Sequence, residues 1–285
     1  MTAVATRPHR VSWFGTLRSE QIKFFSLRST WWVLGVGIAI FILIQWGTIF
    51  GITDTIRSFG GFVDPTELPS DFSAFAVVLV HPLIGATSAI LGVLTVTNEY
   101  ASGMIRSTFT AQPGRIKVLS AKVVLVTAAI AVQSLVAYVL TALIAGGYFT
   151  DVGLNPVDLA SGETWRVIGL FALYTSLCAA VGIGIGAAVR STAGSVSIVL
   201  VLLLLISGLT ALLPWSWVGD VRDILPSNLA TSYLSPDFSE YQEAAGEIGF
   251  ATNRPYSTGV SALIATAWAG VLLVIGGAVM SRRDA

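Results

Sequence analysis

Six long stretches of this 285-residue chain contain no Asp, Glu, Lys or Arg. Each is longer than the roughly 20 apolar residues that a helix needs to cross the hydrocarbon core of a bilayer. Because 54% of all residues are hydrophobic and only 11% are charged, the chain has too little polar sequence to cover a soluble core of that size. We therefore predict a polytopic membrane protein. The charge-free stretches are 29–53, 72–98, 123–150, 167–189, 191–219 and 255–281.

The spans are predicted to be α-helices rather than barrel strands. Residues 198–206 are continuously apolar, whereas a membrane-spanning strand alternates apolar and polar residues over about ten positions. A helix also satisfies its own backbone hydrogen bonds in lipid. The expected fold is all-α, a single transmembrane domain over 1–285. Its six helices are expected at about 31–51, 73–97, 123–147, 167–189, 194–213 and 259–280.

Basic residues are distributed unevenly between the two sides of the predicted spans. Most of the 16 lie in the N-terminal tail, the loop 98–122, Arg190 and the C-terminal Arg282 and Arg283. Most acidic residues lie in the alternate loops. Since cytoplasmic loops are enriched in Lys and Arg, this pattern predicts a multi-pass protein of the cell membrane with both termini in the cytoplasm.

Two further elements are predicted outside the spans. Residues 8–28 form an amphipathic pattern typical of a helix lying in the membrane interface in contact with lipid, although a helix packed on the protein's own cytoplasmic face is the alternative. The external segment 214–258 is too long for a connection without structure, so short helices that re-enter or cap the membrane edge are expected. The residues singled out in the interfacial helix are Trp13, Leu17, Glu20, Lys23, Phe24 and Arg28.

The sequence lacks the groups that would let this chain drive transport alone. No lysine stands in a phosphate-binding Gly-Lys-Ser/Thr motif, two histidines are too few for a metal site, and no paired nucleophile is evident. No carboxylate lies within a span, although ion-coupled transporters usually need an ionisable group there. The polar side chains at membrane depth either line a transport path or form contacts between helices. They include Gln45, Gln133, Thr175 and Ser176.

The basic loop 98–122 is the expected receiver of energy from outside the chain. Apolar positions alternate with basic ones on both sides of a Pro113-Gly114 turn, a pattern that favours two short helices on the cytoplasmic side. For Arg115, Lys117 and Lys122 the alternative is that they only enforce topology. Glu99 is acidic on an otherwise basic face, which topology does not explain.

Here the sequence resembles a known family. The pattern Glu99-Tyr100-x-x-Gly103-x-Ile105-Arg106-x-Thr108, followed by Pro113-x-Arg115 and Ala121-Lys122, is similar to a segment of ABC-2 type permease subunits, particularly those of high-GC Gram-positive bacteria. Ser19-Glu20-x-x-Lys23 and 27–32 resemble the N-terminal entry of the same subunits, and Leu225-Pro226 is a weaker match. Met104 departs from the usual threonine.

The resemblance implies a permease subunit of an exporter, without metal, cofactor or nucleic acid of its own. It would pair with a second copy or a related permease and with two copies of a separate ATP-binding subunit that holds ATP and Mg. The cargo would be an amphipathic or hydrophobic solute such as a drug, antibiotic peptide or lipid. A secondary transporter, a channel or a sensory ABC-type component are the alternatives. The residues implied in ATPase coupling are Glu99, Tyr100, Gly103, Ile105, Arg106, Arg115 and Lys117, with Glu99 and Arg106 as charged anchors.

Overall fold

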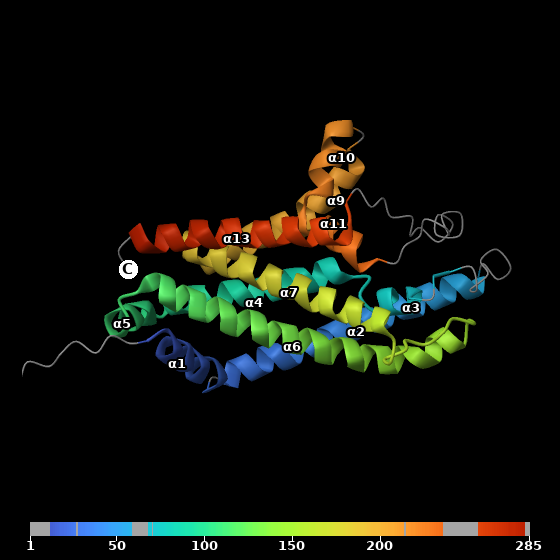
Figure 1. The fold of residues 1–285 in the computed structure, drawn as a ribbon, viewed down its shortest axis with the longest axis horizontal. Helices are drawn as coiled ribbons and strands as arrows, with labels where there is room; N and C mark the ends of the chain where they lie inside the picture. Colours follow the sequence, from blue (N-terminus) through green and yellow to red (C-terminus); the bar gives the residue numbers. More distant parts are fainter. Residues whose placement is uncertain are drawn as a thin grey trace, which may run out of the picture.

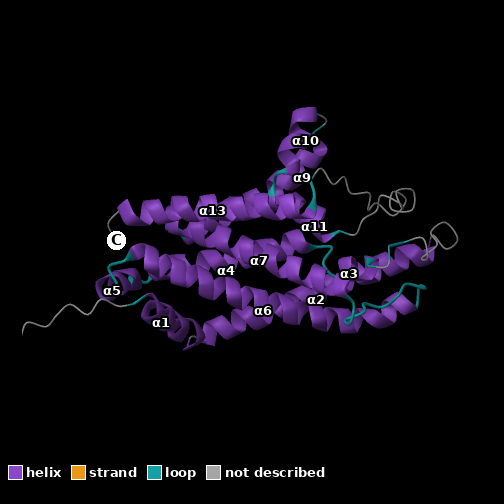
Figure 2. Cartoon of the chain, in the orientation of Figure 1, coloured by secondary structure: helices purple, strands orange, loops and turns teal. Residues whose placement is uncertain are grey.

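The computed structural model describes residues 12–26, 28–58, 68–69, 71–213, 215–235 and 256–282. Every regular element within these residues is helical, as Figure 2 shows, which confirms the all-α prediction. The elements are α1 (Trp13–Ser26), α2 (Arg28–Ser58), α3 (Phe72–Ala76), α4 (His81–Ala101), α5 (Met104–Ala111), α6 (Arg115–Thr150), α7 (Gly162–Val189), α8 (Thr192–Leu200), the π-helical η2 (Val201–Leu205), α9 (Ile206–Leu212), α10 (Ser216–Asp223), α11 (Pro226–Leu234) and α13 (Thr258–Arg282).

Five helical segments are long and apolar enough to cross a membrane. They correspond to the predicted first, third, fourth, fifth and sixth spans, namely Thr30–Ser58, Arg115–Thr150, Gly162–Val189, Thr192–Thr210 and Thr258–Arg282. The six-span count therefore stays a prediction.

The predicted second span is not one continuous helix. Its charge-free stretch begins with the short α3, turns at 77–80 and continues as α4, which starts at His81 and carries Asn98 and Glu99 near its end. A break at membrane depth frees backbone carbonyls that lipid cannot satisfy. Gln45 of α2 donates to the Val77 carbonyl, and the Tyr138 hydroxyl of α6 donates to the Ala74 carbonyl at 2.9 Å. These two side chains thus stabilise the break.

Helix α7 forms the centre of the bundle and packs against α4, α6 and α13 (Figure 1). Its contact with α4 is made at glycines, because a Cβ added at Gly182 would lie 1.9 Å from the Ala89 carbonyl oxygen. A Cβ added at Gly92 of α4 would likewise lie 2.1 Å from the Ala179 oxygen. The small-residue pattern predicted at Gly182 and Gly186 therefore does permit close backbone approach.

The bundle has two distinct ends. At one end, hereafter the α5 end, lie α1, α5, the first turns of α6 and the last turn of α13 (Figure 1). Arg115 links two of these elements, because its guanidinium donates to the Met280 carbonyl at 2.8 Å. The end of α13 and helix α1 thus lie on the same side of the bundle, as an even number of crossings requires.

The opposite end contains the short helices expected in segment 214–258. Helix α11 is buried against α4 and α13, whereas α9 and α10 project from the bundle (Figure 1). His81 Nε2 lies 3.1 Å from the Ser227 carbonyl oxygen and 3.2 Å from Thr231 Oγ1, which fixes α11 on the start of α4. Residues 236–255 of this segment lie outside the described part of the chain.

Candidate functional site

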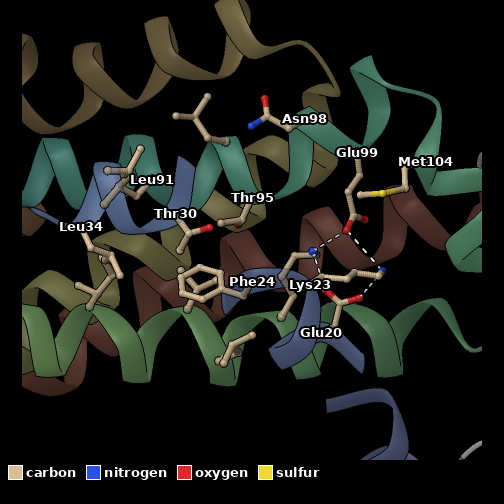
Figure 3. Close-up of a pocket in the computed structure, with 16 residues that line it drawn as sticks. Glu20, Lys23, Phe24, Thr30, Leu34, Leu91, Thr95, Asn98, Glu99 and Met104 are labelled. Carbon is tan, nitrogen blue, oxygen red and sulfur yellow. Dashed lines mark hydrogen bonds and ion pairs between the residues drawn. The ribbon is translucent and has the colours of Figure 1, made fainter. Parts of the chain in front are cut away.

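A cluster of four charged side chains connects three helices at the α5 end. Lys122 of α6 donates to Glu20 Oε2 of α1 at 2.8 Å and to Glu99 Oε1 of α4 at 3.0 Å. Lys23, one turn after Glu20, donates to Glu20 Oε1 at 2.8 Å and lies 3.7 Å from Glu99 Oε1 (Figure 3). We call Glu20, Lys23, Glu99 and Lys122 the charged cluster. It is neutral in total, with two carboxylates and two ammonium groups.

Three of the four side chains of the charged cluster are buried, and Lys23 is the exception. Glu20, Glu99 and Lys122 are only 3%, 4% and 7% exposed, while the Lys23 side chain is 34% exposed. Burying charges costs free energy that is offset only when each is paired. A buried cluster therefore adds little net stability. Its main effect is to determine which helices pack together. Here it specifies that α1 docks against α4 and α6.

Helix α1 is also held by hydrogen bonds to groups outside the charged cluster. The Trp13 indole donates to Ser120 Oγ at 3.0 Å, and the Gln112 amide donates to Thr16 Oγ1 at 2.9 Å. Lys23 donates to Thr108 Oγ1 of α5 at 3.1 Å. Helix α1 is thus joined to α5 as well as to α4 and α6, so these elements form one connected unit at the α5 end.

The pKa of Glu20 predicts how this docking responds to acid. Burial alone raises the pKa of the Glu20 carboxyl, but Lys122 and Lys23 outweigh burial and hold the pKa below the ordinary 4.5. A lowered pKa contributes stability that is present above pH 4.5 and is lost as pH falls through the folded-state value. Amides of α1 should therefore stay protected from hydrogen exchange at pH 5 to 7 and lose protection below pH 4.5, after correction for intrinsic exchange. In Glu20→Gln this acid step should be absent, and an unchanged step would contradict the assignment.

Helix α5 is a short amphipathic helix entered through a glycine. Gly103 has φ of 73°, the left-handed region that favours glycine, and it directly precedes α5. Ile105 and Thr108 face the protein, while Met104, Arg106, Ser107 and Thr110 are exposed. One face of α5 is thus bound to the bundle and the other faces outward.

The second short helix predicted in loop 98–122 is not present. Residues 115–122 instead form the first turns of the 36-residue α6, and 98–101 belong to α4. The turn at Pro113-Gly114 ends α5, but apolar residues after it continue in helical register into the span. The loop is therefore shorter and more rigid than the sequence pattern indicates.

The structure divides the seven residues implied in coupling into three groups. Gly103, Arg106 and Lys117 are exposed, Tyr100 and Arg115 are half-buried, and Glu99 and Ile105 are buried. Arg115 lies 5.0 Å from the Phe109 ring, and Arg190 lies 5.1 Å from the Tyr100 ring. Arg115 thus contacts this chain itself, and Glu99 belongs to the charged cluster. The Arg106 guanidinium forms no hydrogen bond or ion pair within the described residues.

The six residues singled out in the N-terminal helix also differ in how far they are buried. Glu20 is buried, Trp13, Leu17, Lys23 and Phe24 are half-buried, and Arg28 begins α2 and is exposed. Thr16 and Glu20 of α1 face the protein, while Phe14 and Ile22 are 76% and 62% exposed. The part of the predicted range that precedes residue 12, and Leu27, lie outside the described residues.

Of the four candidate path-lining residues, Gln133 borders one of the two cavities described below. Gln133 is half-buried beside a cavity of about 340 Å³ and donates to the Leu34 carbonyl at 3.1 Å. Gln45 is fully buried and binds the Val77 carbonyl. Thr175 hydrogen-bonds Ser134 at 2.8 Å, and Ser176 donates to the Thr127 carbonyl at 3.1 Å. The last three connect helices, which is the alternative that the sequence left open.

Comparison with known families decides the class of this protein. A family model described as ABC-2 family transporter protein matches residues 19–285, nearly the whole chain. The chain belongs to the ABC-2 transporter family. This ABC-2 family member is therefore a multi-pass membrane component of an ABC transporter, and its role is that of a membrane subunit rather than of the catalytic one. Membership also implies partnership with an ABC ATP-binding subunit and dimerisation in general terms. A comparison with curated proteins found no match.

Two members of the connected unit in this ABC-2 protein were not singled out from sequence. The sequence leaves Lys122 open between a role in docking and a role in topology alone, and the structure shows that it binds both Glu20 and Glu99. Thr108 was part of the family pattern without a stated role, yet it accepts from Lys23. The signal that could have found Lys122 is its position at the start of a span, where a lone lysine needs a partner on a neighbouring element.

Proposed function

We propose that this chain is the membrane-spanning subunit of an ATP-driven exporter. It moves an amphipathic or hydrophobic solute out of the cytoplasm or inner leaflet by alternating access at the interface of two permease subunits. Two copies of a separate ATP-binding subunit hold ATP and Mg and supply the energy. The α5 end faces the cytoplasm and docks on these subunits. The observation that carries the proposal is the exposed Arg106 on α5, at the end of the bundle where α1, α4 and α6 are joined.

The geometry supports a specific route for the force. A subunit that binds the exposed face of α5 moves Ile105 and Thr108 on its inner face. Thr108 is bound to Lys23, and the charged cluster connects Lys23 to α4 and α6. Movement of α5 therefore reaches the long α6 and the central α4 together, which favours a rigid shift of helices over a local loop rearrangement.

Arg106→Glu should weaken binding of the ATP-binding subunit. Removing one partner of a hydrogen-bonded charge pair at an interface costs about 2–5 kcal/mol, so we expect at least about tenfold weaker association. The measurement is co-purification of the full chain with its co-expressed ATP-binding subunit under mild detergent, with ATP hydrolysis assayed in reconstituted vesicles.

Arg222→Glu on α10 is the matched control, because it reverses a surface arginine at a site remote from the α5 end. Association should be retained in this variant. Equal association of wild type and Arg106→Glu would contradict the docking role of α5, and failure of wild type to co-purify with any ATP-binding subunit would contradict the proposed function.

A further inference from the structure

Two neighbouring cavities lie along α4, between α2, α4 and α6. The first, of about 180 Å³, lies beside the charged cluster, and the second, of about 340 Å³, lies deeper in the bundle. Val33, Leu91 and Leu94 border both cavities, so the two are neighbours, and together we call them the groove. The groove follows α4 from Glu99 to Ile84, which at 1.5 Å per residue is roughly 22 Å. That length exceeds half of a hydrocarbon core of about 30 Å.

The walls of the groove suit an aliphatic chain. Half of the residues that border the first cavity, and most of those that border the second, are Leu, Val, Ile or aromatic residues. Phe24 and Leu34 line the first cavity, as Figure 3 shows, and Phe41 and Phe171 line the second. Trp32 and Val36, on the α2 side, are 75% and 47% exposed. The groove is therefore open toward the lipid side of α2, so that a chain could enter from the bilayer.

The cytoplasmic end of the groove has an unfilled hydrogen-bonding position. Glu99 is 4% exposed, and its Oε2 accepts no hydrogen bond from any described residue, although its Oε1 is bound by Lys122. Glu99 borders the cavity and points toward Lys23, as Figure 3 shows. A buried acceptor without a donor costs free energy, so a ligand that donates to Oε2 is favoured there.

The charge of the cluster decides what kind of headgroup fits. The cluster is already neutral, so an ammonium or a carboxylate would leave one uncompensated charge in a buried place. A hydroxyl group brings no charge, donates one hydrogen bond and accepts others. It can donate to the Glu99 carboxylate and accept from Lys23, whose side chain is partly exposed and borders the cavity.

We propose that this groove binds one single-chain amphiphile with an uncharged, hydroxyl-bearing headgroup, its hydroxyl at Glu99 and its chain along α4. The site lies within one subunit and requires neither ATP nor a second copy. It deepens the proposed function by naming the cargo class that would rest there. Because binding is measured on the permease alone, its failure is distinguishable from failure of ATPase docking.

The test compares three photoactivatable probes of equal chain length in phosphatidylcholine vesicles containing the full chain. The probes are a monoacylglycerol, a fatty acid and an alkylamine, and adducts are located by mass spectrometry. We expect the monoacylglycerol to label groove positions on α2, α4 and α6 about tenfold more than either charged probe, the effect of one charge-assisted hydrogen bond. Equal labelling by a charged probe, or adducts spread evenly over the exposed faces, would overturn the proposal.

Two variants test the geometry. Leu94→Trp fills the groove and should lower labelling about tenfold, whereas Leu143→Trp, at a 66% exposed position of α6 outside the groove, should leave labelling unchanged. Glu99→Gln leaves the cluster with one net positive charge, so the preferred probe should change from the monoacylglycerol to the fatty acid. An unchanged order of probes in Glu99→Gln, or unchanged labelling in Leu94→Trp, would overturn the proposal.

Discussion

Gly182→Ala should destabilise the protein, whereas Gly169→Ala on the same helix should not. A Cβ at Gly182 would lie 1.9 Å from the Ala89 carbonyl oxygen, while a Cβ at Gly169 meets nothing within 4 Å. The atom that clashes belongs to the backbone of α4, so the two helices must separate. Overpacking of this kind costs about 1–3 kcal/mol, and more when backbones cannot move.

The matched control, Gly169→Ala, shows the change in stability that alanine causes where it meets no clash. Replacing glycine with alanine inside a helix is normally stabilising by about 0.5–1 kcal/mol, because alanine loses less conformational freedom. Gly169→Ala should therefore raise or preserve the midpoint of thermal unfolding in detergent, and Gly182→Ala should lower it and reduce the folded yield. Gly92→Ala, on the other side of the same contact, should behave like Gly182→Ala. Equal unfolding midpoints for the Gly169 and Gly182 variants would contradict the described packing.

Lys122→Met should release α1 from the bundle and uncouple transport from ATP hydrolysis. Lys122 is the only cation of the charged cluster that is almost completely buried, and it binds both carboxylates. Removing one member of a buried pair costs about 3–5 kcal/mol, and here it leaves both carboxylates with Lys23 alone, so that one negative charge is uncompensated. The contacts of α7 with α4 and α13 do not involve Lys122, so insertion should persist. We expect α1 to gain hydrogen exchange and coupled ATP hydrolysis to fall at least about tenfold.

Lys117→Met is the control for α1 docking. It removes the same charge from the same helix, but Lys117 is exposed and belongs to no ion pair of the described residues. Exchange of the α1 amides should stay as in wild type. If both lysine variants released α1 equally, the loss would come from the general positive charge at this end and the charged cluster would have no specific role.

The spans could be predicted from sequence because a helix that crosses lipid must consist of a long stretch of mostly apolar, uncharged residues. The exception is the break at 77–80, which contains no charge, and the signals for it, Gln45 and Tyr138, lie on other helices. Only packing shows that these side chains satisfy Ala74 and Val77. Counting apolar residues along the sequence cannot detect a helix break whose free carbonyls are satisfied by side chains of neighbouring helices.

The candidate site was predicted less well, for two physical reasons. Glu99 was noticed because it is acidic on a basic face, but sequence indicated a surface anchor, whereas the structure buries it between Lys122 and Lys23. The amphipathic pattern of α1 predicts a helix in contact with lipid, which stays a prediction, and the pattern does not show that α1 docks on the protein through Glu20. In both cases the partner is distant in sequence, since Glu20 and Lys122 are 102 positions apart.

Docking of α5 on the ATP-binding subunit can be tested by photo-crosslinking. A photo-crosslinking amino acid replaces Ser107 or Trp165 in the full chain, which is co-expressed with its ATP-binding subunit. Ser107 is exposed on α5, and Trp165 is 50% exposed near the start of α7, at the opposite end of the bundle. If α5 docks on the ATP-binding subunit, position 107 should form a covalent adduct with that subunit and position 165 should form none. An adduct from position 165, or from neither position while the complex co-purifies, would contradict this docking.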